Sequence, residues 1–436
     1  MSLETPESIR QLQRKLYAKA KVEPAYRFYL LYDKVYRADI LAHAYRLARQ
    51  HGEAPGVDGV TYPDIEAQGV EKWLAGLGEE LHTRTYRPAP VRRVMIEKPG
   101  GGERPLGIPT IRDRVVQTAA KLVLEPIFEA DFEDSAYGYR PGRSAQQAVK
   151  AVHTALCQGY TDVVDADLAQ YFDTIPHHEL MQSVARRVVD RYLLKLVKSW
   201  LKVPVEECDE RGNRKRTGGK RSQRGTPQGG VISPLLANLY MNRILKAWRR
   251  QGKDRQYQAR IIAYADDFVI VSRGHAAAAL EWTRQATRAI GLTLNETKTH
   301  LRDAHRETFD FLGYRFGIER YRKDGHTYLA AQPSQRSVHR VKQAVRGVLR
   351  PGNQAPWPEV AARLNRILRG WANYFSYGTR TMAYRAVDQY VYHGVRHFLR
   401  RRHKVPTRGT RRFAIDRVFG ELGVLRLRTL QLESSP

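Results

Sequence analysis

Two adjacent aspartates, Asp266 and Asp267, are the side chains of this sequence that most directly suggest chemistry. They lie in the stretch ARIIAYADDFVIVSR (259–273), where the apolar runs 261–264 and 268–271 predict two short strands joined by a tight turn. Two carboxylates at the tip of a turn repel each other unless a cation lies between them. Mg²⁺ suits them, because it prefers oxygen ligands and often needs only one or two carboxylates plus substrate phosphates. The alternative is a solvated turn, since Asp is a favoured turn residue.

A second acidic segment, DVVDADLAQYFD (162–173), reads as a strand followed by a turn. Asp165 and Asp167 share one face of this strand because side chains alternate along it, and Asp167 lies at the strand's end. An acid at a strand end, beside another strand that carries two acids, is a typical metal-site arrangement. An acidic strand end that contacts only solvent is the alternative.

A third segment, VRRVMIEKPGGGERPLGIP (91–109), predicts a hairpin with a flexible triple-glycine turn. Lys98 and Arg104 flank that turn, so two cations would project from the two arms of one hairpin. Such a hairpin can close over a triphosphate, although a surface hairpin with ordinary charges explains the same residues. Further on, the double glycine after Gln228 allows the backbone to approach a ligand closely.

The elements that must position these residues have a recognisable order. From residue 161 the pattern is strand, helices, strand–turn–strand, helix, strand, which is the split βαββαβ plan. One helix is expected over 178–201 and another over 276–290, ended by Gly291. The plan places Asp167 beside the central hairpin that carries the adjacent aspartates.

The flanking regions are mostly helical. Residues 1–50 predict either an amphipathic helix pair or a cap or RNA-facing extension, and 207–225 is expected to be a basic, glycine-rich loop that forms the tip of a hairpin. After residue 330, three helices are predicted over 335–349, 358–375 and 380–402, with a short tail after them. The first has a valine stripe on one side. Basic residues suited to gripping a nucleic-acid backbone occupy its other surface, namely Arg336, Arg340, Lys342, Arg346 and Arg350.

Composition points to a polyanionic partner. The chain of 436 residues has a formal net charge of +29, and an excess this large usually marks binding to nucleic acid. Residues 331–436 hold 21 Lys/Arg against 5 Asp/Glu, and 211–224 holds seven basic residues and no acidic one. Two cysteines without a C-x-x-C pair make a disulfide framework or zinc module unexpected. No apolar run is long enough to cross a membrane and the first residues lack a signal-peptide core, so we expect a cytoplasmic protein.

Across about residues 50–405 the sequence resembles bacterial group II intron reverse transcriptase/maturases. The resemblance rests on ordered motifs: GVDGV (56–60), RPLGIPTIRDRVVQ (104–117), YGYRPGRSAQQAV (137–149), DADLAQYFDTIPH (165–177), GTPQGGVISPLLANL (225–239), YADD (264–267), LNETKT (294–299), FLGY (311–314) and GWANYF (370–375). It implies an α+β right-hand polymerase, with a helical N-terminal extension (1–50), fingers and palm (51–318), a helical thumb or maturase domain (330–405) and a short basic C-terminal segment (406–436).

The resemblance also implies roles for individual residues. Asp167 and Asp266 would bind two Mg²⁺ ions, for which Mn²⁺ is an alternative, with Asp267 as a supporting ligand. Position in the motifs implies further roles: Lys98 and Arg104 would clamp the triphosphate, Gln228 would border the nucleotide pocket, Lys298 would lie near the leaving pyrophosphate, and Phe172 would discriminate sugars. From the residues alone, the alternatives for Phe172 are a core position, or neighbouring Tyr171 as the ring that faces the sugar.

The implied activity is copying of RNA into cDNA, together with binding of intron RNA to assist splicing and mobility. Its partners would be template and intron RNA, an RNA–DNA hybrid, deoxynucleoside triphosphates and, as a further candidate, target DNA, with no membrane. Two alternatives stay open: a domesticated reverse transcriptase in defence or repair without an intron, and a non-enzymatic RNA-binding maturase. The sequence departs from the family in having no C-terminal cysteine-pair endonuclease module. The motifs do not explain the basic insert at 211–224.

Overall fold

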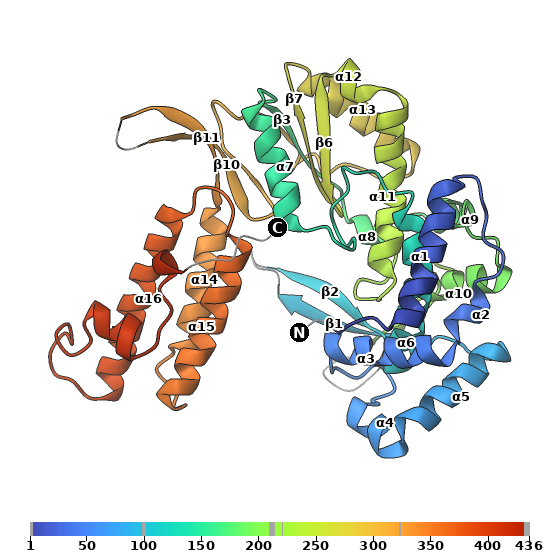
Figure 1. Ribbon diagram of the computed structural model, residues 1–436, viewed down its shortest axis with the longest axis horizontal. Coiled ribbons are helices and arrows are strands. Elements are labelled where there is room, and N and C mark those ends of the chain that lie inside the picture. Colours follow the sequence, from blue (N-terminus) through green and yellow to red (C-terminus); the bar gives the residue numbers. More distant parts are fainter. Residues whose placement is uncertain (1–2, 98–101, 209–213, 220, 322–323, 431–436) are drawn as a thin grey trace.

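The first helices form one packed unit. The computed structural model describes residues 3–97, 102–208, 214–219, 221–321 and 324–430 (Figure 1). Its N-terminal helices are α1 (Glu7–Val22), α2 (Tyr32–Val35), α3 (Ala38–His51), α4 (Tyr62–Gln68) and α5 (Val70–His82). Both α1 and α3 pack on α6 (Ile111–Glu129), a helix that is buried along most of its length. The first fifty residues therefore share a hydrophobic core with the helices and strands after residue 110.

A four-stranded antiparallel sheet lies at the centre of the molecule. Its strands are β3 (Asp162–Asp167), β6 (Ala259–Tyr264), β7 (Asp267–Ser272) and β8 (His300–Asp303), in the order β6-β7-β3-β8. Val163 and Val271 point into a core shared with α7 (Ala145–Cys157), whereas Val164 and Ile270 point into the main core. Helices cover that second face: α11 (Ser233–Arg250), α12 (Lys253–Gln256) and α13 (Ala276–Ala289). The sheet is thus buried on both sides, and its ends are left to carry polar groups.

The helix expected over 178–201 is wrong, because the chain forms two helices there. They are α9 (His177–Ala185) and α10 (Arg191–Leu201), and the short α8 (Tyr171–Thr174) precedes them. The break is fixed by Asp190, whose carboxylate accepts the backbone N–H groups of Tyr192 and Leu193 at the start of α10, at 3.0 and 3.2 Å. The same carboxylate accepts the N–H groups of Leu31 and Tyr32, at 2.9 and 2.8 Å. A capping residue that also binds a distant loop ends the helical run.

The loop expected at a hairpin tip over 207–225 does belong to a hairpin, but the hairpin's strands extend into that range. β4 (Pro204–Cys208) and β5 (Arg214–Gly218) pair with each other, and β4 also pairs in parallel with β1 (Val91–Glu97). β1 forms the predicted hairpin with β2 (Glu103–Ile108), so the sheet order is β2-β1-β4-β5. The high charge of this insert hid its strand character, because residues 206–207 and 214–216 are runs of consecutive charged residues without the apolar alternation of a strand.

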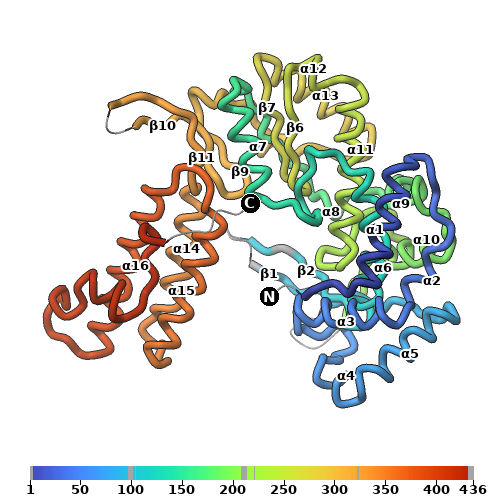
Figure 2. Tube along the Cα trace, in the orientation of Figure 1, coloured from blue at the N-terminus to red at the C-terminus, as the bar shows by residue number. Residues whose placement is uncertain are grey.

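The C-terminal third is a helical unit behind a small sheet. β9 (Phe309–Phe311), β10 (Tyr314–Arg320) and β11 (Thr327–Pro333) form the sheet. The three predicted helices are confirmed as α14 (Gln335–Val348), α15 (Trp357–Tyr374) and α16 (Thr381–Arg402). The tail is folded back on them through η1 (Arg417–Glu421) and η2 (Leu427–Thr429), and it contributes Val418 and Leu427 to their core. Figure 2 shows this unit at the opposite end of the molecule from α1–α5.

In the part of the chain that the structure describes, no helix combines the length and apolar character needed to cross a membrane.

Candidate polymerase site

The acidic residues of the two predicted segments meet at one end of the central sheet. Asp167, the last residue of β3, is paired with Asp267, the first residue of β7. Asp266 precedes it in a two-residue turn that begins at Ala265, whose φ of 59° lies in the left-handed region. Asp165 shares the face of Asp167 one pleat further along β3. The sheet therefore gathers four carboxyl groups, as the βαββαβ plan predicted for Asp167.

The turn that carries Asp266 is held from behind by the segment 135–138. Backbone bonds join Tyr137 N–H to Ala263 O at 2.8 Å, and Ala263 N–H to Ser135 O at 2.9 Å. Gly138 lies so close to the turn that a Cβ on it would be 2.4 Å from the Ala265 nitrogen. The Gly138 carbonyl in turn accepts a hydrogen bond from the Asn238 side chain on α11. Sequence reasoning used YGYR only as a family motif and missed this support, for which the glycine was the available signal.

The electrostatics of the cluster favour a bound cation. Burial raises the pKa of Asp266, and the neighbouring Asp167 raises it further. The pKa of Asp267 is raised to about 7, first by burial and then by Asp165, Asp266 and Asp167, while a backbone hydrogen bond from Leu312 opposes the rise. These carboxyls resist ionising together unless positive charge is supplied.

The donor set fits a magnesium ion that also binds substrate. Among the described residues there is no group of three or more His, Cys, Asp or Glu side chains arranged to enclose a metal ion. Mg²⁺ does not require one, because it is commonly held by one or two carboxylates, water and substrate phosphates. Asp167, whose side chain is 38% exposed, leaves room for such a shared ion.

Lys298 is brought to the site as the resemblance implied. Its Nζ lies 3.1 Å from Oδ2 of Asp167, and its side chain is 66% exposed. The segment that carries it is tied to the end of β3, because Asn295 N–H donates to the Asp167 carbonyl at 2.8 Å. An exposed ammonium beside a metal-binding acid is free to move to a phosphate when substrate arrives.

The two aromatic residues after β3 have different environments. Tyr171 is buried, and its hydroxyl donates to the Ala237 carbonyl at 2.7 Å, so this ring is a core side chain. Phe172 is only half-buried, packing against the core with one side. Gln170, with φ of 45°, makes the sharp turn that separates β3 from α8. Of the two candidate rings, only Phe172 has surface left for a ligand.

Gln228 lies in a turn fixed to the β1–β2 hairpin. Its carbonyl accepts the Gly107 N–H at 2.6 Å, and its side-chain amide donates to Asp173 at 2.9 Å. The next residue, Gly229, has φ of 103°, and a Cβ there would lie 2.3 Å from the Gly107 carbonyl oxygen. Arg104 lies on β2 opposite Ile96 by backbone register, but its side chain and all of Lys98 fall outside the described residues.

The site is also connected to the C-terminal helices. The backbone of Leu312, which bonds Asp267, accepts the Tyr374 hydroxyl at 2.8 Å through its carbonyl. Tyr374 is the last residue of α15, and its carbonyl accepts the Tyr314 hydroxyl at 2.9 Å. α14 reaches the same turn through Ser337, whose hydroxyl donates to the Gly313 carbonyl at 2.9 Å. Burial raises the pKa of Tyr374 to about 12, and Arg340 on α14 lowers it. Helices α14 and α15 are therefore positioned directly against the acidic end of the sheet.

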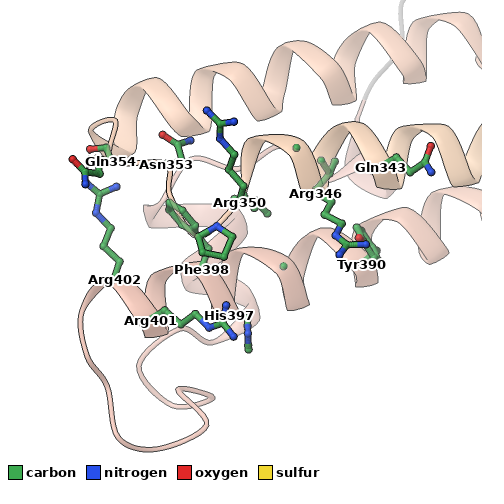
Figure 3. Close-up of a pocket in the computed structure, with 15 residues that line it drawn as sticks. Gln343, Arg346, Arg350, Asn353, Gln354, Tyr390, His397, Phe398, Arg401 and Arg402 are labelled. Atoms are coloured by element: carbon green, nitrogen blue, oxygen red, sulfur yellow. Dashed lines mark hydrogen bonds between the residues drawn. The ribbon is translucent and has the colours of Figure 1, made fainter. Parts of the chain in front are cut away.

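The predicted basic residues of α14 lie along two edges of the helix. Arg336 and Arg340 are exposed near the turn of the small sheet, where Arg340 donates to Ser337. The second edge faces α16 across a groove of about 1030 Å³ (Figure 3). Figure 3 shows Arg346 extending toward Tyr390 on the facing helix. The basic residues of the groove are Arg346, Arg350, His397, Arg401 and Arg402.

Charge in this groove is strongly unbalanced. The pKa of His397 is lowered by burial and then by three arginines on the same helix, Arg401, Arg400 and Arg396. Lys342 lies over the ring of Tyr390, with Nζ 5.5 Å from its centroid. Arg402 differs from the other basic residues of the groove, because its guanidinium already donates hydrogen bonds to the carbonyls of Ala355 and Gln354. A cation next to a half-buried aromatic ring that still borders the groove is suited to the phosphates and bases of a nucleic acid.

Comparison with known proteins agrees with this geometry. Residues 96–316 match the family model described as reverse transcriptase (RNA-dependent DNA polymerase), and residues 338–415 match that of the group II intron, maturase-specific domain. Protein YkfC of Escherichia coli (strain K12) is 36% identical over 72% of this chain and 90% of its own length. Group II intron-encoded protein LtrA of Lactococcus lactis subsp. cremoris is 32% identical over 50% of this chain and 35% of its own. An uncharacterized 91 kDa protein in a cob intron of Schizosaccharomyces pombe is 25% identical, and the match spans 69% of this chain and 45% of that protein.

Proposed function

This chain belongs to the group II intron reverse transcriptases that carry a maturase domain and is an RNA-directed DNA polymerase, and we propose that Asp167 and Asp266 hold the two Mg²⁺ ions of its polymerase site. The observation that carries this proposal is the register of β3 and β7, which pairs Asp167 with Asp267 and sets Asp266 next to them. Asp267, whose pKa is raised the most among these acids, lies on the buried side of the pair and supports it.

When bound, two Mg²⁺ ions, or Mn²⁺ in their place, stabilise both the attacking and the leaving oxygens of an in-line phosphoryl displacement. The protein's own side chains bind and orient the nucleotide. Lys298, next to Asp167, supplies a cation for the pyrophosphate that leaves. Lys98 and Arg104 bind the triphosphate from the β1–β2 hairpin, and the Gln228 turn forms the wall of the pocket against β2.

The remaining elements take the parts of a right hand. The central sheet with α11 and α13 is the palm, the β1–β2 hairpin with its helices is the fingers, and α14–α16 form the thumb. The thumb's location supports this interpretation, since α14 and α15 meet the acidic end of the sheet through Tyr374 and Arg340. On this basis Arg336 and Arg340 follow the RNA–DNA hybrid, whereas the groove of Arg346 and Arg350 binds intron RNA during splicing. Target DNA is a further candidate partner.

Two other functions are weaker. A non-enzymatic maturase has no need for a complete set of site residues, yet Asp167, Asp266, Asp267 and Lys298 are all present and close together. A domesticated enzyme without an intron is not favoured either, because the C-terminal helices match the maturase-specific domain of group II introns. Assistance to splicing follows from that match and rests on surface contacts rather than on metal binding.

Primer extension on an RNA template tests the proposed site. The substitution Asp266→Asn should abolish cDNA synthesis with Mg²⁺, while the Kd for the template–primer changes less than about threefold, because affinity comes mainly from phosphate contacts elsewhere. Asp254→Asn, which removes an exposed aspartate on α12, is the matched control and should extend at the wild-type rate. Extension by Asp266→Asn at a near wild-type rate would remove Asp266 from the site.

A further inference from the structure

The β4–β5 hairpin has no role in the polymerase site, yet it is built into the same sheet as the β1–β2 hairpin. β4 runs parallel to β1 with Val91 paired to Val205 and Arg92 to Glu206. The β1–β2 and β4–β5 hairpins therefore point in the same direction. Since each strand in a sheet is about 4.8 Å from the next, β5 lies roughly 10 Å from β1. The side chains of β5 are therefore separated from the triphosphate-binding β1–β2 hairpin, and we expect them to bind a different ligand.

One face of this sheet carries a row of arginines, which we call the arginine face and define as Arg92, Glu206, Arg214 and Arg216. Register puts Arg92 beside Glu206 and Glu206 opposite Arg216, and Arg214 shares their face because it is two residues from Arg216. The Glu206 side chain is only 6% exposed, while those of Arg214 and Arg216 are each 65% exposed. Three arginines against one glutamate leave this face with a formal charge of +2.

Glu206 orients the exposed arginines. Its Oε2 lies 2.8 Å from Nε of Arg216, and its Oε1 lies 3.4 Å from an Nη of Arg214. A buried carboxylate that binds two guanidinium groups from below limits their motion and leaves the remaining N–H donors facing solvent. Among the residues that the structure describes, the buried Nε of Arg92 has no hydrogen-bond partner, so this arginine too is incompletely satisfied. Such fixed donors suit phosphate oxygens.

The opposite face of the same strands is balanced, because Arg93 and Lys215 there are matched by Glu103 and Glu207. Arg93 on β1 and Glu207 on β4 form an ion pair of 2.7 Å, and Glu207 is paired in register with Lys215. Positive charge is therefore concentrated on one side of the sheet. Because side chains alternate between the two faces of β5, its positive charges are divided unevenly between them. A strand that is merely solvated would not be expected to show this division.

The arginine face extends to the turn that follows Gln228. Leu106 pairs with Val94 and Ile108 pairs with Arg92, so Leu106 lies on the face of Arg92. A Cβ on Gly229 would be 3.0 Å from Cδ1 of Leu106, which places that face against the turn that follows Gln228. A polymer that leaves the pocket over Leu106 would reach the arginines of β1 and β5 next.

We propose that the arginine face binds backbone phosphates of the unpaired RNA template before it enters the polymerase site. This inference rests on the proposed function, in which the thumb holds the hybrid. Figure 1 places α14–α16 at one end of the molecule and the helices α3–α6 at the other, with the β1–β2 hairpin between them. Template that has not yet been copied lies on the side of the site away from the hybrid. Contacts to phosphates alone carry no sequence information. An enzyme that copies templates of any sequence requires contacts of this kind.

Template–primers with different single-stranded overhangs test the proposal. Two substrates share one duplex, and their 5′ template overhangs are one nucleotide or roughly fifteen, within the span that single-strand sites cover. Arg214→Gln/Arg216→Gln removes two charges but keeps amide donors for Glu206. It should raise the Kd of the long-overhang substrate about tenfold and flatten its log Kd–log salt slope by about 1.4, and it should leave the Kd of the short one within about twofold. Lys215→Gln, on the opposite face, is the matched control and should change neither.

Several outcomes would overturn the proposal. They are equal affinity of the wild type for both overhangs, an unchanged slope in the double variant, a loss in Lys215→Gln as large as in the double variant, or equal weakening of a hairpin RNA that has no overhang. If the double variant melts at a lower temperature, Arg92→Gln decides instead, because it leaves both partners of Glu206 in place, and it should weaken long-overhang binding alone. Absence of nucleotide incorporation by the wild type on the short substrate would instead count against the polymerase function, so the two failures are distinguishable.

Discussion

Replacing Gly138 by alanine tests how tightly the catalytic turn is held. A Cβ at this position would lie 2.4 Å from the backbone nitrogen of Ala265, where ordinary contacts begin at 3.4 Å, so the two backbones must separate by about 1 Å. Backbone cannot yield as a flexible side chain does. Overpacking of this kind costs about 1–3 kcal/mol of stability. A displacement of about 1 Å at a reacting group lowers the rate about a hundredfold, and Asp266 follows Ala265 directly.

The assay is single-nucleotide incorporation on an RNA template, with thermal melting measured in parallel. We expect Gly138→Ala to lose about two orders of magnitude in kcat while remaining folded and keeping its affinity for template–primer. Gly76→Ala on α5 is the matched control, because nothing lies within 4 Å of its Cβ and its backbone is helical. It should keep full activity and gain about 0.5–1 kcal/mol. A Gly138→Ala enzyme with wild-type kcat would refute the claim that this contact sets the position of Asp266.

Side chains outside the metal site give three more testable expectations. Phe172→Val should improve the kcat/KM for ribonucleotides relative to deoxyribonucleotides by about ten- to a hundredfold, as the ring no longer excludes a 2′-hydroxyl; general loss of activity with unchanged preference would make it a core residue. Neutralising Arg336 and Arg340 together should flatten the salt dependence of hybrid binding by about 1.4–1.8 log units per log unit of salt, and an unchanged slope would assign them to a solvated face. Asp190→Ala should lower the free energy of unfolding by about 2–4 kcal/mol in denaturant titrations, since four backbone N–H groups lose their acceptor, and a loss under about 0.5 kcal/mol would contradict that role.

Local patterns predicted the elements whose neighbours along the chain decide their structure. The apolar runs around Asp266 and Asp267 predicted the β6–β7 hairpin, and the valine stripe predicted α14. The meeting of Asp167 with that hairpin was predicted from the order of elements, because the βαββαβ plan leaves few ways to pair the strands. These are features that short-range sequence and simple topology rules can specify.

Features that depend on distant contacts were not predictable in the same way. Asp190 interrupts a continuous helical pattern because it binds Leu31 and Tyr32, about 160 residues earlier in the chain. Arg214–Gly218 is a strand because it pairs with β4, and the high charge of this segment concealed its strand character in the sequence. The support that Gly138 gives to the catalytic turn is visible only as a distance between two backbones.

Counting the metal ions of the assembled complex tests the central claim most directly. The protein is bound to an RNA–DNA template–primer with a non-extendable 3′ end and the next deoxynucleoside triphosphate, and bound Mn²⁺ is measured by electron paramagnetic resonance. We predict two Mn²⁺ ions per wild-type complex, and a loss of at least one of them in Asp167→Asn and in Asp266→Asn, with template–primer still bound. Two ions bound equally well by both variants would contradict the assignment of these aspartates.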